Sequence, residues 1–558
     1  MQKPRLMKGG EAIVNSLLSH NVDTFFGLPG VQTYEIFDAL YTHSDKVTLY
    51  VPKHEQTAGY MAYGYAKSGA GAGIFSVVPG PGVLNAGAAL CTAQGASAPV
   101  MCITGQVPSG FLGKGYGHLH ELPDQLATVG SFTKSARRIE HGAQAPALVN
   151  DAFEQMTTGR PGAVHLEMTW DELSRTSSVL ISESGIHERS VAIPEAFDVE
   201  NAIELIKESK FPMLFVGGGA TGACEEIQEL ANLLEIPVVA HRAGRGVVSE
   251  SEDLGLFGYA GRLLWEHVDL VIAIGTRLEM PYLRWQQYDR YSPRPSYPKL
   301  VRIDIDPMEH VRWPADVAIT ADAKVAVAAL LSEVKAGGIA SFRLAAAARK
   351  AKEIAKAQMN AQLAPQMELL SVIRRVLPKD GFFVDELCQL GFASWNGFPI
   401  YEPRTFVSSG PQGTLGSGFP TALGVKAAHP ERAVVSVTGD GGFMFAAQEL
   451  VTAATYKLGV VVVLINNGGF ANVRRDQELR FESRVIAADF DNPDFQAMSN
   501  ALGVQSSRVR DIDQFESALK AAMERNEPWL IEVVVDRGSE PTPWPFIHPA
   551  KSLESVSV

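Results

Sequence analysis

Short apolar runs alternate with segments of helical periodicity along most of the chain. The apolar runs are rich in β-branched residues and are bounded by Gly, Pro or Asp, which is typical of strands buried on both faces of a parallel sheet. They occupy residues 72–78, 99–104, 213–216, 238–240, 270–274, 300–305, 433–437 and 460–465. Helical segments lie between them, as at residues 10–20, 220–234 and 446–456. The pattern predicts an α/β fold of doubly wound, mostly parallel sheets.

Two changes of composition divide the chain. Residues 175–195 are polar and Ser-rich and have no clear period, and residues 335–365 combine a Gly-containing break with an Ala/Lys-rich segment that we expect to be a solvated helix. These linkers predict three domains of the usual size, at residues 1–180, 190–340 and 365–558.

Composition limits the classes of partner. The net charge is −13 over 558 residues, and such an acidic chain does not attract phosphates, so we expect neither a nucleic acid nor a membrane as partner. No apolar run approaches the roughly 20 residues that span a bilayer, and the N-terminal segment lacks the pattern of a signal peptide. The four cysteines are dispersed without a CxxC pair, which argues against a disulfide framework or zinc site and indicates a cytoplasmic protein.

Polar side chains follow two of the predicted strands in the third domain. Asp440 lies in a Gly-Asp-Gly turn just after the run at 433–437, and Asn467 ends an Asn-Asn pair just after the run at 460–465. Open α/β sheets bind ligands at the carboxyl ends of their strands. A Mg²⁺ ion on a diphosphate prefers oxygen ligands, which the Asp440 carboxylate, the Asn467 amide and the carbonyl of Gly469 can supply.

The glycines around Asp440 strengthen this interpretation. Gly439, Gly441 and Gly442 let the backbone approach a ligand closely. A helix predicted over residues 443–458 would offer the free N–H groups of its first turn to an anion. Each half of the motif alone is a common turn or loop, whereas both halves after two buried strands indicate a site for Mg²⁺ and a diphosphate.

The stretch from Gly439 to Asn467, GDGGFMFAAQELVTAATYKLGVVVVLINN, resembles the signature that binds thiamine diphosphate (ThDP) in the pyruvate decarboxylase and acetolactate synthase superfamily. The resemblance covers about residues 5–540, in the order pyrimidine-binding, central and diphosphate-binding domain. It implies ThDP and Mg²⁺ as cofactors. In such enzymes the cofactor lies between two subunits, which implies a homodimer at minimum and commonly a homotetramer, with Glu55 and Asp440 of one subunit serving different cofactors.

Further segments agree with this resemblance. Gly30 lies in an opening strand–turn, Glu55 follows His54 at the start of a helix-like segment, and Gly80 lies in a Gly-Pro-Gly turn. The resemblance makes Glu55 the acid that faces the aminopyrimidine of ThDP and favours its imino form, which then removes the C2 proton to give the ylid. It makes the Gly80 turn a wall facing the cofactor, although a purely structural turn explains those glycines equally well.

The segment GTLGSGFP in the third domain resembles the family's pyrimidine-binding loop. There the carbonyl of Gly413 would accept a hydrogen bond from the 4′-amino group. Leu415 would lie between the two cofactor rings and enforce their V shape. Gln389 matches a position that often touches the diphosphate.

By the same resemblance, the polar segment at residues 115–125 is expected to face the reacting carbon, where related lyases and synthases carry Gln or His. His120 and Glu121 are candidates for proton transfer, with His118 behind them, since a histidine of near-neutral pKa suits that work. A solvated polar loop is an equally good interpretation.

The resemblance implies that the ylid adds to a 2-oxo acid or diketone and that C–C cleavage leaves an enamine. Acetolactate synthase is the closest likeness, so a carboligase is expected. A 2-oxo acid decarboxylase or a diketone hydrolase is the alternative. A non-catalytic ThDP-fold binding protein is disfavoured because Glu55, Asp440, Asn467 and Leu415 are all present.

Two departures from acetolactate synthase indicate a different substrate. Residues 276–281 (TRLEMP) lack the second arginine of the corresponding run, and residues 473–477 (VRRDQ) lack its tryptophan. Arg474, Arg475 and Asp476 would bind an anionic substrate or form a surface charge cluster.

In the central domain, residues 217–219 form a Gly-rich turn. Relatives that contain FAD or ADP bind the nucleotide in this domain. Relatives without a nucleotide keep the same turn, so the presence of FAD stays open.

Overall fold

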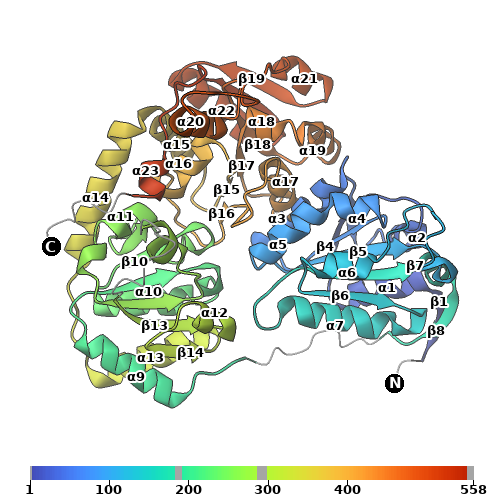
Figure 1. Cartoon of the computed structure of the whole chain (residues 1–558), viewed down its shortest axis with the longest axis horizontal. Coiled ribbons are helices and arrows are strands. Elements are labelled where there is room, and N and C mark those ends of the chain that lie inside the picture. Colours follow the sequence, from blue (N-terminus) through green and yellow to red (C-terminus); the bar gives the residue numbers. More distant parts are fainter. Residues whose placement is uncertain (1–2, 182–190, 286–297, 550–558) are drawn as a thin grey trace.

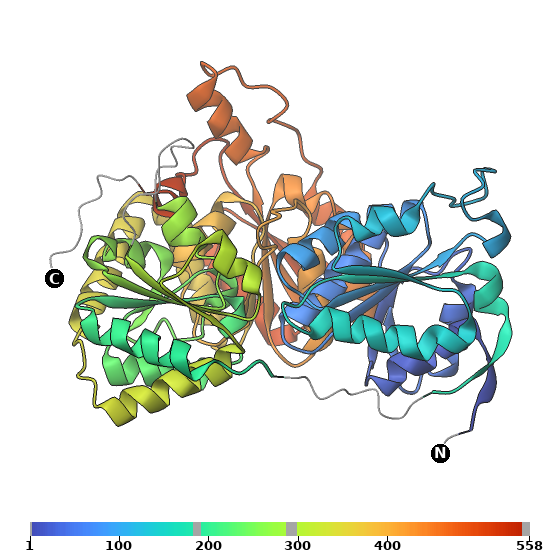
Figure 2. The ribbon, with the colours of Figure 1, turned by 60° about the horizontal axis from the view of Figure 1, so that its bottom comes forward.

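The computed structural model describes residues 3–181, 191–285 and 298–549, which fold into three α/β domains (Figure 1). Each domain is built on one six-stranded sheet, and the strands of all three sheets pair in parallel. The predicted α/β fold of parallel sheets is therefore confirmed. The first domain (blue) and the second (green) lie beside each other, and the third (orange to red) lies against both (Figures 1 and 2).

The first domain orders its strands β3-β2-β4-β5-β7-β6. These strands are β2 (Thr24–Gly27), β3 (Thr48–Tyr50), β4 (Gly73–Val77), β5 (Val100–Gln106), β6 (Ser135–Ile139) and β7 (Val164–Thr169). Its helices are α1 (Gly9–Ser19), α2 (Tyr34–Thr42), α3 (Glu55–Lys67), α4 (Pro81–Asn85), α5 (Gly87–Gly95), α6 (Gln125–Gly130), α7 (Ala145–Thr157) and α8 (Trp170–Ser174). Strands β1 (Arg5–Lys8) and β8 (Thr176–Val179) form a separate antiparallel pair that brings the two ends of the domain together.

The second domain orders its strands β11-β10-β9-β12-β13-β14. These strands are β9 (Pro212–Val216), β10 (Val238–Ala240), β11 (Gly255–Phe257), β12 (Leu270–Ile274), β13 (Lys299–Asp304) and β14 (Val317–Thr320). Its helices are α9 (Ala196–Glu208), α10 (Cys224–Leu234), α11 (Gly258–Arg262), α12 (Pro307–Arg312) and α13 (Ala323–Gly337). The predicted Ala/Lys-rich helix is α14 (Ala345–Gln362), which leads into the third domain.

The third domain orders its strands β16-β15-β17-β18-β20-β19. These strands are β15 (Phe382–Val384), β16 (Phe406–Val407), β17 (Val434–Gly439), β18 (Val460–Asn466), β19 (Gln505–Val509) and β20 (Trp529–Val534). Its helices are α15 (Ala364–Val376), α16 (Gln389–Gly397), α17 (Gly418–Ala428), α18 (Asp440–Phe443), α19 (Leu450–Tyr456), α20 (Ala471–Arg480), α21 (Phe495–Ala501), α22 (Ile512–Arg525) and α23 (Trp544–Ile547). If strands are numbered within each domain, the first and third sheets share the order 2-1-3-4-6-5.

The predicted single helix over residues 443–458 is wrong in its extent. The chain instead forms the four-residue helix α18 from Asp440, a turn, a 3₁₀ segment at Ala447–Glu449, and then α19 from Leu450. The break falls at residues 444–446, beyond Gly441 and Gly442, which lie inside α18 and weaken it as a helix. Asp440 is thus the first residue of a helix rather than a residue before one. Within the described ranges, no helix combines the length and apolarity needed to cross a membrane.

The first and third domains share one hydrophobic core, which centres on helices α3 and α17. These two helices approach so closely that a Cβ atom on Gly424 would lie 2.0 Å from the carbonyl oxygen of Met61, and one on Gly64 would lie 2.1 Å from that of Thr421. Glycine at both positions therefore allows backbone-to-backbone packing between the domains. The contact fixes α3, which begins at Glu55, relative to α17, which follows the loop that carries Leu415.

We expect Gly424→Ala to lower the free energy of unfolding by about 1–3 kcal/mol, because overpacking forces the two helices apart. The matched control is Gly222→Ala, since a Cβ at Gly222 meets nothing within 4 Å. Thermal and chemical denaturation of both variants measure the effect. Equal stability of the two variants would contradict a close helix contact at this place.

Candidate functional site

Asp440 is buried at the junction between β17 and α18, with 1% of its surface exposed. One carboxylate oxygen accepts a hydrogen bond from the N–H of Gly441 (2.8 Å). The other accepts from the N–H groups of Asn467 (3.1 Å) and Gly468 (2.7 Å) and from the side chain of Asn492 (2.7 Å). Burial raises the pKa of Asp440 against the effect of these donors. The carboxylate therefore ties the end of β17 to the loop after β18.

Asn492 was not predicted from the sequence. Its amide donates both to Asp440 and to the side-chain oxygen of Asn466 (2.8 Å). It comes from a loop far along the chain, and no local motif marks it.

Three of the residues predicted to bind cofactor or metal line one small cavity of about 120 Å³. They are Gln389, Asn467 and Gly469, and Glu540 lines the same cavity. The side-chain oxygen of Gln389 is buried without a hydrogen-bond partner, and a buried polar atom of this kind calls for a partner that the described residues do not supply. The structure thus brings together residues from α16, the loop after β18 and the C-terminal segment.

Glu540 was also missed by sequence reasoning. It accepts a hydrogen bond from the side-chain nitrogen of Asn467 (2.5 Å). Burial raises the pKa of Glu540, and the nearby charge of Asp440 raises it further. Two carboxylates therefore flank Asn467.

A third buried carboxylate, Glu386, joins the two motifs of the third domain. It accepts hydrogen bonds from the N–H groups of Gly416 (2.5 Å) and Gly418 (3.2 Å) and from the hydroxyl of Thr438 (2.9 Å). A Cβ on Gly442 would lie 2.2 Å from the same carboxylate. Glu386 thus holds the loop of Gly413 and Leu415 against the strand that ends at Gly439. The sequence signal was an acid just after the apolar strand β15.

Gly413 and Leu415 lie in this loop, as expected. Gly413 has a φ of +59°, in the left-handed region that favours glycine. Leu415 is half-buried, whereas the flanking Gly416 is buried. The leucine is therefore presented at the surface of the loop rather than enclosed in the core.

In the first domain, Glu55 begins helix α3. Its carboxylate accepts a hydrogen bond from the side chain of Asn85 (3.1 Å) and lies 3.9 Å from the ring of His54. His54 caps the helix by accepting from the N–H of Gln56. Glu55 is partly exposed, at 22% of its side-chain surface, so it is accessible to a ligand.

His120 is held by Gln32, a residue that sequence reasoning did not single out. The Gln32 amide nitrogen donates to the carbonyl of Leu119 (2.8 Å), so its oxygen faces Nδ1 of His120 (3.0 Å). Nδ1 must then carry the proton, which leaves Nε2 as a free acceptor. Burial lowers the pKa of His120, and the nearby His118 lowers it further, so this ring is neutral at pH 7.

Glu121 and His118 have different surroundings. The Glu121 carboxylate accepts hydrogen bonds from the N–H groups of Gly115 and His118 (both 2.9 Å). These hydrogen bonds lower the pKa of Glu121, and the one from His118 has the largest effect. The exposed ring of His118 packs on Phe111, with centroids 4.9 Å apart. Glu121 therefore shapes the loop that presents His120.

The Gly80 turn is supported by a buried polar network. The N–H of Gly80 donates to Gln125 (2.9 Å), and Gln125 donates to Glu167 (2.7 Å), which Arg138 pairs at 2.7 Å. Gly80 has a φ of +63°, and a Cβ there would lie 2.6 Å from the carbonyl of His120. The turn and the His120 loop are therefore packed against each other.

Gly30 belongs to the same group of loops. A Cβ on Gly30 would lie 2.5 Å from Val78, two residues before Gly80. The structure thus brings Gly30, Gly80 and His120 to neighbouring loops at one end of the first sheet.

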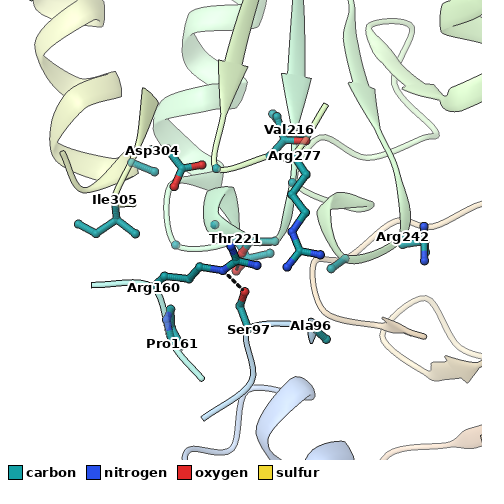
Figure 3. Close-up of a pocket in the computed structure, with 18 of the residues that line it drawn as sticks. Ala96, Ser97, Arg160, Pro161, Val216, Thr221, Arg242, Arg277, Asp304 and Ile305 are labelled. Carbon is teal, nitrogen blue, oxygen red and sulfur yellow. Dashed lines mark hydrogen bonds between the residues drawn. The ribbon is translucent and has the colours of Figure 1, made fainter. Parts of the chain in front are cut away.

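A second cavity, of about 670 Å³, lies between the three domains. Residues 217–219 follow β9 and residues 275–277 follow β12. These strands are neighbours whose chain connections lead to opposite sides of the sheet, which is where such sheets bind nucleotides. Arg160 and Arg277 extend into the space beyond the strand ends (Figure 3). Burial raises the pKa of Asp304, on the same wall, to about 6.

The run at residues 276–281 lines this interdomain cavity. Burial raises the pKa of Glu279, but the Arg242 guanidinium outweighs this effect and holds the pKa at about 2. Arg242 and Arg284 both form ion pairs with Glu279. On α20, Arg474 pairs with Glu478 and Asp489. Glu279 thus carries one negative charge between two arginines, whereas Arg474 has two acidic partners.

The residues around Asp440 fit a diphosphate-bound Mg²⁺. In the part of the chain that the structure describes, no three His, Cys, Asp or Glu side chains gather to hold a metal by themselves. Asp440, Asn467 and Gly469 would supply only part of an octahedral set of oxygen ligands. A diphosphate and water would complete the octahedron, and the unpartnered Gln389 lines the same cavity.

Comparison with known families gives matches to three domain models in the order of the three sheets. They are described as the N-terminal TPP binding domain, the central domain and the C-terminal TPP binding domain of thiamine pyrophosphate enzymes, and they match residues 7–128, 199–330 and 388–533. The matched N- and C-terminal models include Glu55 and Asp440, respectively.

Several curated proteins are similar over nearly the whole chain. A probable 2-ketoarginine decarboxylase of Pseudomonas aeruginosa is 32% identical, covering 96% of this chain and 95% of that protein. A probable acetolactate synthase large subunit of Methanocaldococcus jannaschii is 32% identical, covering 99% and 95%. The acetolactate synthase large subunit of Corynebacterium glutamicum is 32% identical, covering 99% and 90%.

The buried Glu386 predicts a pH-dependent stability. Burial raises the pKa of Glu386 to about 7, above the ~4.3 of a carboxyl in an unfolded chain. The folded state therefore favours protonated Glu386. The stability that this preference contributes is fully present below the pKa of the unfolded chain and is lost as the pH rises through about 7. The Glu386→Gln variant cannot ionise, so the difference in Tm between it and the parent should shift in the variant's favour from pH 5 to pH 8. Differential scanning fluorimetry measures this, with the exposed Glu527→Gln as control, and a difference that stays constant with pH would contradict it.

Proposed function

Since the chain belongs to the family of thiamine pyrophosphate enzymes, we propose that it is a Mg²⁺-assisted carboligase of 2-oxo acids or diketones, similar to acetolactate synthase. The observation that carries the proposal is the group around Asp440. A buried carboxylate, an amide and an unpartnered glutamine meet where two parallel strands end. When bound there, ThDP supplies a nucleophilic carbon and an electron sink for making or breaking a bond next to a carbonyl.

The residues of the third domain would hold this cofactor. Asp440, the amide of Asn467 and the carbonyl of Gly469 would bind Mg²⁺, and the N–H group of Gly442 and the side chain of Gln389 would bind the diphosphate. Gly413 and Leu415 would orient the pyrimidine ring. Glu386 supports this last role because it fixes the loop that carries both residues.

The residues of the first domain would move protons. Glu55 would share a proton with the pyrimidine ring, and Nε2 of His120 would take or give a proton at the reacting carbon. The Gln32 contact supports this because it fixes the ring orientation and the tautomer of His120. Glu121 and His118 would act through the loop, since Glu121 binds its backbone N–H groups.

A 2-oxo acid decarboxylase is the second candidate. It is favoured by the similarity to the probable 2-ketoarginine decarboxylase, which extends over 95% of that protein. The bare Nε2 of His120 would first take up a proton and then return it to the intermediate in such an enzyme. The departures at residues 276–281 and 473–477 from acetolactate synthase agree with a substrate other than that of the biosynthetic enzyme.

FAD is proposed for the cavity between the three domains. The support is its position at the point where β9 and β12 diverge, its Gly-rich turn at 217–219, and the cation of Arg277. Its volume of about 670 Å³ falls in the range of ligand pockets, roughly 300–1,000 Å³. The absorption spectrum of the supernatant after denaturation would distinguish FAD from ADP, because only FAD is yellow.

The assembly is proposed to be a homodimer at least, and a homotetramer by family resemblance, in the cytoplasm. The proposal is supported by the placement of the predicted proton-transfer residues and the predicted metal ligands in separate domains of one chain. Each cofactor would then lie between the first domain of one subunit and the third domain of its partner.

Products formed with ThDP, Mg²⁺ and a panel of 2-oxo acids and diketones test the reaction. We expect release of CO₂ together with a 2-hydroxy ketone or acetohydroxy acid. Release of CO₂ with an aldehyde alone would favour the decarboxylase. Cleavage of a diketone without CO₂ would favour the hydrolase, and ThDP binding with no turnover of any donor would contradict an enzyme.

Glu55→Gln separates binding from activation. We expect ThDP to bind with nearly the parent affinity, whereas exchange of its C2 proton with D₂O slows by roughly 10²–10⁴-fold, the usual contribution of a proton-transfer group. Quenched-flow NMR measures the exchange. Asp440→Ala is the comparison, since it should abolish Mg²⁺-dependent binding instead. Exchange at the parent rate in Glu55→Gln would show that Glu55 has another role.

A further inference from the structure

The amide of Asn467 can present either its oxygen or its nitrogen to a bound cation, and only the oxygen can ligate it. In the structure the nitrogen donates to Glu540, while the oxygen accepts from the N–H of Gly469 at 3.1 Å and retains a second lone pair. An opposite rotamer would turn the amide oxygen toward the Glu540 carboxylate, and two acceptors repel each other. Glu540 therefore selects the orientation in which Asn467 can bind a metal.

The backbone around Glu540 is held by hydrogen bonds of its neighbours. Glu540 lies in the segment after β20, between Ser539 and Pro541. The hydroxyl of Ser539 donates to the carbonyl of Asp536 (2.7 Å), and the carbonyl of Pro541 accepts from the side chain of Gln366 (2.7 Å). Two residues further on, the hydroxyl of Thr542 accepts from Arg475 (2.6 Å). These bonds fix the backbone on both sides of Glu540, whose side chain lines the same cavity as Asn467 and Gly469.

Within the described residues neither Asp440 nor Glu540 makes an ion pair, although Arg474, Arg475 and Arg537 line the same cavity as Glu540. Asp440 accepts hydrogen bonds only from neutral amide groups, and Glu540 accepts from the neutral amide of Asn467. The charge that attracts a divalent cation here is therefore that of Asp440, and Glu540 acts on the orientation of the Asn467 amide.

We propose that Glu540 is a positioning residue for the metal: it fixes the Asn467 amide with its oxygen available to the cation, without ligating the cation itself. The inference rests on the proposed Mg²⁺ site. Groups that hydrogen-bond to a metal ligand commonly change metal affinity by 10–100-fold. The same magnitude is expected here.

The test measures cation affinity rather than turnover. In the full-length protein with saturating ThDP, Mn²⁺ binding is titrated by electron paramagnetic resonance and Mg²⁺ binding by calorimetry. Glu540→Ala should weaken both by roughly 10–100-fold. Glu540→Gln keeps an oxygen that can accept from Asn467, so it should recover affinity to within a few-fold of the parent. The exposed Glu527→Ala should bind as the parent does.

The outcomes separate this inference from the proposed function. If the parent binds no Mn²⁺ with ThDP, the metal site and the role of Glu540 both fail. If Glu540→Ala binds Mn²⁺ as tightly as the parent does, only the role of Glu540 fails, whatever the effect of the substitution on Tm. If Glu540→Gln is as weak as Glu540→Ala, the negative charge matters and not the orientation of Asn467, which also overturns the proposal.

Discussion

The third domain depends on carboxylates that are buried where its parallel strands end. Backbone N–H groups at such ends are left without strand partners, and an acid can satisfy several of them at once. Asp440 does this for the loop after β18, and Glu386 does it for the loop before α17. Desolvation makes each acid costly to bury. The hydrogen bonds offset that cost, so the loops around a ligand are fixed before any ligand arrives.

The second constraint joins the domains to one another. Helices α3 and α17 pack with their backbones in contact at Gly64 and Gly424, inside a core that the first and third domains share. This contact makes a rigid unit of two sheets with the same strand order. The second sheet has a different order and forms a separate wall of the interdomain cavity.

The sequence predicted the parts of this structure that depend on local pattern. Buried strands such as β9, β12 and β18 appear as apolar runs, and the residues just after β17 and β18 could be placed together because carboxyl ends of neighbouring strands meet. Short or partly polar strands such as β3 and β19 have no such run, and no glycine or proline marks the turn at residues 444–446 that separates α18 from α19. Glu540 and Asn492 reach Asn467 and Asp440 from distant segments, so only tertiary folding reveals them. The pairing of His120 with Gln32 likewise joins two loops that are 88 positions apart.

The shared strand order of the first and third sheets has a consequence for how such a chain can change. One scaffold is used twice, and each copy carries its own loops at the carboxyl ends of its strands. The loops of the third domain are tied together by buried acids, so a substitution in one disturbs the others. The loop at residues 109–121 is largely exposed and is held by a few contacts to Gln32, Gly80 and Asp171. New substrates can therefore be accommodated by altering the first copy while the second continues to hold the same cofactor.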